Sequence, residues 1–420
     1  MLKCALYYVF MDNSILENVV SDESIRRTKK TPLWIKIVWP ISIIFAVVLA
    51  YLIIIFTGTE ETKILQDAMR IIRSNSFFYS KETDTLVESA VSGMTASLND
   101  NYAAYYTEEE YAEMNKSNSG YYSGIGIVLQ QQDIGRFEII QIFEDSPAAE
   151  SDLMIGDLIV ELNGVSSEGL DISTFLENMN AEDGEENILI VSRNENLLEY
   201  RITSRQIYAP KISFKMQTDS IGYIYLSQFR GECVSEFKDA VEELLDKGMQ
   251  SLILDLRDNP GGSLYDVLDI ADFLLDEGLI ITTLRSNDDT ITQSYQTTDD
   301  GYDFPVVVLV NKNSASASEL LSGALKDHKR AFLIGTTTFG KGIVQTFYYL
   351  AGTGGYIKIT SEAYYTPNNV CIQGIGIVPD LIVENPEEAN KYAISAIPYD
   401  LDLQLQAAID YLNSEVMDNS

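Results

Sequence analysis

The pattern of apolar and polar residues changes three times along this chain. Residues 37–56 read IVWPISIIFAVVLAYLIIIF and carry no charged side chain. At about 1.5 Å per residue, a helix of this length is about long enough to cross the hydrocarbon core of a bilayer. We therefore predict a transmembrane helix over 37–57.

Helical periodicity follows the apolar run. The segments TKILQDAMRIIRSNSFFYS and DTLVESAVSGMTASL both suit helices. In the second segment, apolar residues recur at three- and four-residue steps and form one stripe, which consists of Leu86, Val87, Ala90, Val91, Met94 and Leu98. The stripe predicts a packing face, against a neighbouring element or a second copy of the chain, so a homodimer or larger homo-oligomer is left open.

Strand periodicity begins near Ser119. Short runs of β-branched and aromatic residues, separated by polar or glycine-bearing turns, predict strands at GIGIVLQ, RFEIIQIF, LIVELNG, NILIVSR and LEYRITSR. Two segments between them, SPAAESDL and ISTFLENMN, are predicted to be helices. Together they predict a small unit of strands and two helices that ends near Ile207.

Beyond residue 207 the chain alternates between strand and helix patterns. The predicted strands are IGYIYLSQF, SLILDL, PVVVLVN and AFLIG, and the helices between them are VSEFKDAVEELLDKG, LYDVLDIADFLLDEG and SELLSGALKDHKR. This alternation predicts an α/β sheet with helical crossovers. In such sheets, functional groups gather at the carboxyl ends of the strands.

Charge suggests an orientation and excludes one class of partner. The chain has 420 residues, with 29 Lys and Arg against 63 Asp and Glu, so its formal net charge is -34. A chain this acidic does not suit phosphate neutralisation, and we expect no nucleic-acid partner. Arg26, Arg27, Lys29 and Lys30 precede the apolar run, so the positive-inside rule places residues 1–36 in the cytoplasm and everything after about residue 58 outside. A cleaved signal peptide is the alternative, but the apolar run is long for one.

Histidine and cysteine are scarce, which limits the available chemistry. His328 is the single histidine and lies in the charged stretch KDHKR, where we expect a solvated surface side chain. Cys233 and Cys371 follow the apolar run, and we predict two unpaired thiols. Zinc sites built from His and Cys are therefore not expected, and we predict no metal and no cofactor.

Residues 335–345 read GTTTFGKGIVQ, and the first seven letters match the spacing of a phosphate-binding loop. Such a loop needs Ser or Thr directly after the lysine and a helix that begins there. Here Gly342 follows the lysine, and the next residues, IVQTFYYL, indicate a strand. We therefore do not expect a nucleotide site.

Lys341 has a second interpretation as a general base. Burial among apolar residues disfavours an ammonium, and a neutral amine can accept a proton. A nucleophile is available upstream in NSASASELLSGAL, where Ser316 or a neighbouring serine stands at a predicted helix start. A Ser-Lys hydrolase is one interpretation; serines that only cap the helix are the alternative.

From about residue 63 to 400, the chain resembles the carboxyl-terminal processing proteases, also called tail-specific proteases, which are serine endopeptidases with a PDZ domain and a Ser-Lys dyad. The resemblance rests on several motifs in the family's order: DNYAAYYTEEEY, GYYSGIGIVL, DSPAAESDLMIGDLIVELNG, LSQF, LDLRDNPGGSLYDVLDIADFLL, VLVNKNSASASELLSGALKDHKRAFLIGTTTFGKGIVQ and EAYYTPNNVCIQGIGIVPD. It implies an α/β protease core, similar to the ClpP and crotonase folds, with an inserted α+β PDZ domain.

The resemblance implies a role for particular residues. Ser316 would be the nucleophile, Lys341 the base and Gln345 the residue that orients the amine. The oxyanion hole would use N–H groups of Ala317 and of Gly261 or Gly262. Asp327 matches an aspartate that assists in some relatives, with an ordinary surface carboxylate as the alternative.

The implied PDZ domain would bind the C-terminus of a protein or peptide. An extended peptide can add as a strand beside GIGIVL, with its carboxylate held by backbone N–H groups around Gly124, Ile125, Gly126 and Ile127. Leu153 and the ISTFLENMN helix would line the groove. A simple strand-entry turn is the alternative reading of these glycines.

Five positions depart from the family's usual pattern: Ser151, Asp152, Asp258, Thr336 and Cys371. None of them is one of the residues implied to act in catalysis. They bear on regulation and substrate preference more than on the chemistry.

The expected organisation has six parts. A cytoplasmic tail (1–36) and the transmembrane helix (37–57) precede an N-terminal helical segment (58–117), a PDZ domain (118–206), a protease core (207–400) and a C-terminal helix with its tail (401–420). We expect a single-pass protein of the cell membrane whose catalytic part lies outside and cuts proteins with accessible C-termini. A catalytically inactive, membrane-tethered PDZ scaffold is the alternative.

Overall fold

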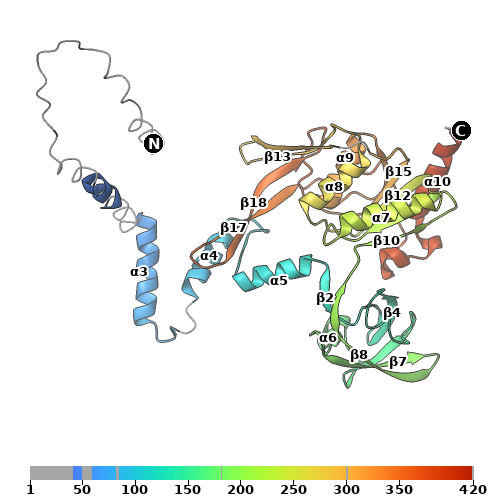
Figure 1. Ribbon diagram of the computed structural model, residues 1–420, viewed down its shortest axis with the longest axis horizontal. Coiled ribbons are helices and arrows are strands. Elements are labelled where there is room, and N and C mark those ends of the chain that lie inside the picture. The colour runs from blue at the N-terminus through green and yellow to red at the C-terminus, as the bar shows by residue number, and fades with distance from the viewer. Residues whose placement is uncertain (1–40, 50–58, 82–84, 181, 299–300, 419–420) are drawn as a thin grey trace, which may run out of the picture. The chain divides into compact units, whose positions relative to one another are not determined.

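A computed structural model of the chain describes residues 41–49, 59–81, 85–180, 182–298 and 301–418 (Figure 1). The chain divides into two compact units, Met1–Leu86 and Val87–Ser420.

The first unit corrects the predicted localisation. Residues 41–49 are helical, and α3 (Glu60–Asn75) begins after the capping residue Thr59. Among the residues that the structure describes, no helix is both long and apolar enough to cross a membrane. Of the predicted span 37–57, residues 37–40 and 50–57 lie outside the described residues. The prediction of a single-pass membrane protein is contradicted by the absence of such a helix among the described residues, and the expected tail 1–36 lies outside them.

A six-stranded core sheet organises the second unit. Its order is β10 (Ile212–Met216), β11 (Ile221–Leu226), β12 (Ser251–Asp255), β15 (Val306–Val310), β16 (Ala331–Gly335) and β19 (Leu381–Ile382). All neighbours pair in parallel except β10 and β11. Every residue of β12 and β15 is buried, as continuous apolar runs covered on both faces should be. The predicted α/β sheet is present.

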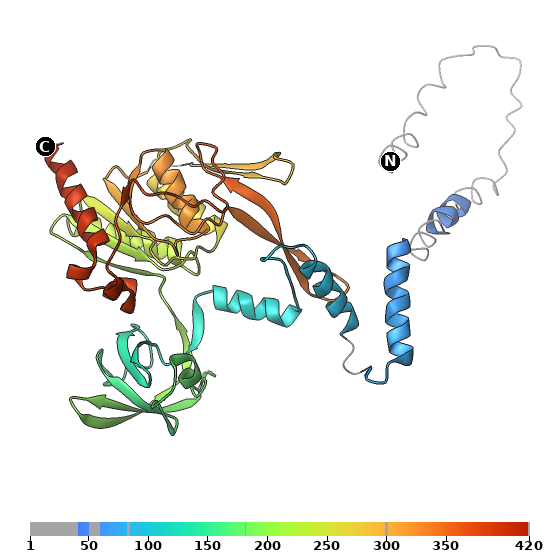
Figure 2. The same cartoon turned by 180° about the vertical axis from the view of Figure 1, so that it is seen from behind.

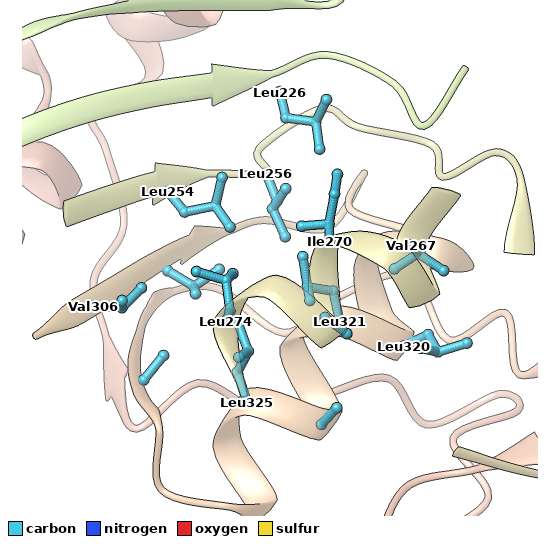
Figure 3. Packing of buried hydrophobic residues seen from close by; sticks show 14 of the residues in the cluster. Leu226, Leu254, Leu256, Val267, Ile270, Leu274, Val306, Leu320, Leu321 and Leu325 are labelled. Atoms are coloured by element: carbon cyan, nitrogen blue, oxygen red, sulfur yellow. The ribbon is translucent and has the colours of Figure 1, made fainter. Parts of the chain in front are cut away.

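Helices cover both faces of the core sheet. Three helices, α7 (Cys233–Asp246), α8 (Leu264–Leu274) and α9 (Ala317–Asp327), share one hydrophobic cluster with the sheet. Figure 3 shows labelled side chains of α8 and α9 facing those of the strands, including Ile270, Leu274 and Leu321 opposite Leu226, Leu254 and Leu256. On the other face lies α10 (Leu403–Asp418), with its own cluster, and Figure 2 shows it from behind.

A second sheet is antiparallel and was not predicted. It contains β1 (Ala104–Tyr106), β18 (Tyr356–Tyr365), β13 (Ile280–Arg285) and β14 (Ile291–Gln296), with β17 (Ile343–Tyr349) paired to β18. Helices α4 (Leu86–Ala96) and α5 (Glu108–Asn118) flank β1 in sequence. Three short 3-10 helices, η1 (Glu387–Lys391), η2 (Ile394–Ala396) and η3 (Tyr399–Leu401), precede α10.

The strands expected upstream form what we call the small β unit, residues 121–208. Its six-stranded sheet contains β3 (Ile127–Asp133), β4 (Arg136–Ile142), β5 (Leu158–Leu162), β6 (Val165–Ser166), β7 (Glu186–Arg193) and β8 (Asn196–Thr203). A ribbon of β2 (Tyr121–Gly124) and β9 (Arg205–Tyr208) closes the unit at its two ends.

One of the two helices predicted here is wrong, and the other is short. Residues 146–153 form turns, because the hydroxyls of Ser146 and Ser151 accept from the Ala149 and Leu153 N–H groups in place of a helical ladder. The helix α6 covers only Ile172–Leu176.

Candidate active site

The structure separates the middle serine of the SASAS run from its two neighbours. Ser314 and Ser318 are fully buried, and their hydroxyls donate to the backbone oxygens of Leu256 (2.8 Å) and Asn259 (2.9 Å). Ser316 is only partly buried and lines a small pocket of about 110 Å³. Its backbone has φ 56° and ψ -113°, a region that residues other than glycine rarely adopt. Of the three serines, only Ser316 lines this pocket.

The Asn259–Gly262 turn lies directly against this serine. A Cβ on Gly261 would lie 2.6 Å from the Ala315 carbonyl oxygen, and one on Gly262 would lie 2.0 Å from the Phe229 carbonyl oxygen, so only glycine fits at either position. The Gly261 N–H donates to Asn259 Oδ1 (2.8 Å). Gly262 lines the pocket with Ala317, the first residue of α9, where helical N–H groups lack partners within the helix.

Lys341 and Gln345 line the same pocket, although they come from the loop before β17 and from β17 itself. The pKa of Lys341 is lowered by burial, then by the positive charge of Lys358, and Glu319 opposes the shift. The Gln345 amide donates to Thr360 Oγ1 (3.4 Å). Among the described residues, no hydrogen bond within 3.5 Å joins the Lys341 amine to the Ser316 hydroxyl.

The carboxylate of Glu319, which the sequence did not reveal, connects the start of α9 at Ser316 to the loop 338–341 that carries Lys341. Glu319 is fully buried in the first turn of α9. Its oxygens accept from the N–H groups of Ser316 (2.9 Å), Gly340 (2.7 Å) and Lys341 (2.9 Å) and from the hydroxyl of Thr338 (2.6 Å). In the sequence, the Ser-x-x-Glu spacing of Ser316 and Glu319 is typical of a helix capping box. That spacing does not reveal that Glu319 also accepts from Thr338, Gly340 and Lys341.

Tyr364 makes a second link between the same loops. Its hydroxyl lies 2.9 Å from the Ser316 carbonyl oxygen and 2.6 Å from the Lys341 carbonyl oxygen. Burial raises the pKa of Tyr364 well above its usual value, so the hydroxyl keeps its proton and can donate. Tyr364 therefore ties the backbone of Ser316 to the backbone of Lys341, and both residues line the same pocket.

The remaining candidates lie elsewhere. Asp327, at the end of α9, accepts from the Asn368 N–H (2.8 Å) and does not line the pocket. His328 is half-buried, with Nε2 2.7 Å from the Ile280 carbonyl oxygen, so the expectation of a solvated histidine is wrong. Asp258 and Thr336 line a separate pocket of about 980 Å³ at the carboxyl ends of β12 and β16.

The predicted peptide-binding residues lie in the small β unit. Gly126 has φ 88°, and a Cβ there would meet the Ser146 Cβ at 2.1 Å. The loop it belongs to enters β3, and the Gln131 side chain of β3 accepts from the Ile172 N–H at the start of α6 (3.2 Å), so strand and helix are neighbours. Ile125 and Leu153 are 2% and 6% exposed and belong to the core of the unit, which leaves Leu153 little surface for a ligand.

The two cysteines named in the sequence analysis are free thiols in the structure. Cys233 is buried, and burial raises its pKa to about 12. Its thiol therefore stays protonated at neutral pH.

Comparison with known proteins places this geometry in context. The sequence profile of peptidase family S41 matches residues 220–383. A carboxy-terminal-processing protease of Bartonella bacilliformis is 34% identical over 308 residues, which is 72% of this chain and 70% of that protein. A probable CtpA-like serine protease of Staphylococcus haemolyticus is 31% identical over 357 residues, 84% of this chain and 71% of that protein.

Among solved structures, the chain is similar to the photosystem II D1 C-terminal processing protease. It is 23% identical, with a TM-score of 0.49, over 80% of this chain and 96% of that chain.

Proposed function

Because the chain belongs to peptidase family S41 and is a serine-type peptidase, we propose that Ser316 is its nucleophile and Lys341 its general base. The observation that carries this proposal is the pocket of about 110 Å³, which is lined by Ser316, Lys341 and Gln345 together. Its relatives are named as carboxy-terminal-processing proteases, and we infer the same reaction here: hydrolysis of peptide bonds in the C-terminal regions of proteins.

The reaction follows from the groups that line the pocket. The neutral Lys341 amine takes the proton of the Ser316 hydroxyl as the oxygen attacks the peptide carbonyl, and the new ammonium returns that proton to the leaving amine. Water then hydrolyses the acyl-enzyme by the same proton route in reverse. The lowered pKa of Lys341 supports this role, because it increases the neutral fraction of the amine.

The oxyanion is held by backbone N–H groups. Ala317 and Gly262 are our candidates, because both line the pocket and the Gly261 N–H already donates to Asn259 Oδ1. Of the two glycines that the sequence left open, we therefore propose Gly262 as the donor. Gln345 is assigned to orient the amine, since it shares the pocket with Lys341.

The small β unit is proposed to be a PDZ domain, and residues 207–400 a ClpP-like protease core. A peptide would add beside β3, with α6 across the groove and its carboxylate at the N–H groups around Gly126. The adjacency of β3 and α6 and the tight turn at Gly126 support this proposal. Leu153 would then act through the core of the domain and not as a groove surface.

The test is cleavage of an unfolded protein by the full chain. The parent should cut it near its C-terminus, while Ser316→Ala and Lys341→Ala should each lower kcat/KM by about a thousandfold or more. The Ser316→Ala chain should still bind the peptide. If Ser316→Ala cut as fast as the parent, the assignment would be wrong; if the parent bound peptide but cut none, the chain would be an inactive peptide-binding scaffold.

A further inference from the structure

A segment far upstream of the pocket reaches Lys341. We call residues 100–106 the arm. Its strand β1 pairs antiparallel with β18, with Ala104 opposite Lys358 and Tyr106 opposite Tyr356. Strand β18, which carries Tyr364 and Lys358, therefore also pairs with the arm.

Asp100 fixes the start of the arm. Its two carboxylate oxygens accept from the Thr360 N–H (3.0 Å) and from the Tyr102 N–H (2.9 Å). Burial acts to raise the pKa of Asp100, but these N–H donors outweigh it and lower the pKa, so the carboxylate stays charged at neutral pH. Asp100 therefore attaches the arm to Thr360, whose hydroxyl also accepts from the Gln345 amide.

This anchoring places an aromatic ring on the amine. Lys341 Nζ lies 4.6 Å from the centroid of the Tyr102 ring. The face of such a ring attracts an ammonium but not a neutral amine. In the same structure the amine makes no hydrogen bond within 3.5 Å to the Ser316 hydroxyl, both being described residues.

We propose that the arm is part of the active site and that Tyr102 is a positioning residue, which holds the protonated amine of Lys341 in a resting place away from Ser316. This rests on the proposed roles of Ser316 and Lys341. Hydrolysis then requires the amine to leave the ring, give up its proton and reach the serine hydroxyl.

The other groups around Lys341 set the direction of the expected effect. Burial and Lys358 on β18 favour the neutral amine, and Glu319 on α9 favours the ammonium. Lys358 itself donates to the Tyr106 hydroxyl (2.9 Å), so the arm contacts both cations. Tyr364 stays neutral through burial. Removing the Tyr102 ring takes away one stabiliser of the ammonium and leaves Lys358, the charged group that disfavours it, in place.

The experiment compares Tyr102→Leu with Tyr102→Phe in the full chain. One readout is the rate at which acetic anhydride acetylates Lys341, measured by peptide mass mapping against pH. The other is kcat for an unfolded protein over the same pH range. The leucine variant should move both acid-side midpoints to lower pH and raise kcat at neutral pH about three- to thirty-fold, whereas phenylalanine, which keeps the ring face, should behave as the parent.

A matched control uses a ring that does not touch the amine. Tyr111 stacks on Tyr356 with centroids 3.7 Å apart, and Tyr111→Leu should leave the Lys341 midpoint unchanged. The proposal is overturned if the leucine and phenylalanine variants share one midpoint, if Tyr102→Leu lowers kcat with the midpoint unmoved, or if Tyr111→Leu shifts the midpoint equally. Acetylation does not depend on catalysis, so a shifted midpoint in a chain that cuts nothing would retain the arm and reject the proposed function.

Discussion

Arg257 and Glu319 are both fully buried charges that follow strands of the core sheet, yet their surroundings differ. Arg257 comes after β12 and is paired with Asp255 (2.6 Å) and Asp402 (2.7 Å). Glu319 comes after β15 and has no ion pair within 4 Å in the described part of the chain; four neutral donors surround it instead.

This difference in partners indicates different roles: Arg257 stabilises the fold, whereas Glu319 positions the loops of the candidate site. Burial acts to lower the pKa of Arg257, but its two carboxylates outweigh it and raise the pKa, so the cation is fully compensated. Its network also ties the end of β12 to the start of α10, through Asp402 and Gln404. Glu319 ties two loops that carry the proposed nucleophile and base. Loss of Arg257 should therefore destabilise the fold, whereas loss of Glu319 should misplace the proposed nucleophile and base.

The largest expected effect is on stability. Arg257→Met removes one cation and leaves two carboxylates buried, so the free energy of unfolding should fall by about 3–5 kcal/mol. Urea denaturation measures it. Arg201, whose pairs with Glu186 and Glu199 are exposed, provides the control, and Arg201→Met should cost under about 1 kcal/mol. Equal losses for the two variants would contradict the structural role of Arg257.

Glu319→Gln should have the opposite effect to Arg257→Met, with a large loss of activity and a small loss of stability. A glutamine amide offers one acceptor oxygen, and its NH2 group would face donors, so the two loops lose their common partner. We expect kcat/KM to fall about a hundredfold or more, with a stability loss of only about 1–3 kcal/mol. Peptide cleavage and urea denaturation of the same sample check both numbers.

The control for this variant is an exposed glutamate. Glu243 pairs with Lys247 at the surface of α7, and Glu243→Gln should leave cleavage unchanged. A Glu319→Gln chain that cuts within about threefold of the parent would show that the loops are held by other contacts, Tyr364 foremost.

The same comparison shows what the sequence could predict. The core sheet was predictable because its buried strands, such as SLILD and VVVLV, are continuous apolar runs that can be recognised from the local sequence alone. Glu319 was not, because its partners Thr338 and Gly340 belong to another loop and no local pattern connects them. The antiparallel sheet was missed for a similar reason, since β1 pairs with a strand some 250 residues later.

Three predictions failed or weakened for identifiable physical reasons. The segment 146–153 has the composition of a helix, but serine hydroxyls take its backbone donors. Leu153 was expected at a ligand groove, but an apolar residue between strands is as easily core, and here it is. The expected membrane span rested on hydropathy alone, and in the described residues no helix has the necessary length.

The central claim is that Lys341 activates Ser316, and the most direct measurement is the rate at which a serine-directed acylating reagent labels the full chain as a function of pH. The account predicts a single adduct, on Ser316. Its formation rate should rise with pH through a midpoint below the ordinary lysine pKa of 10.5, because burial lowers the pKa of Lys341, and Lys341→Met should abolish it. An adduct on another serine, or labelling of Ser316 at an undiminished rate in Lys341→Met, would contradict the account.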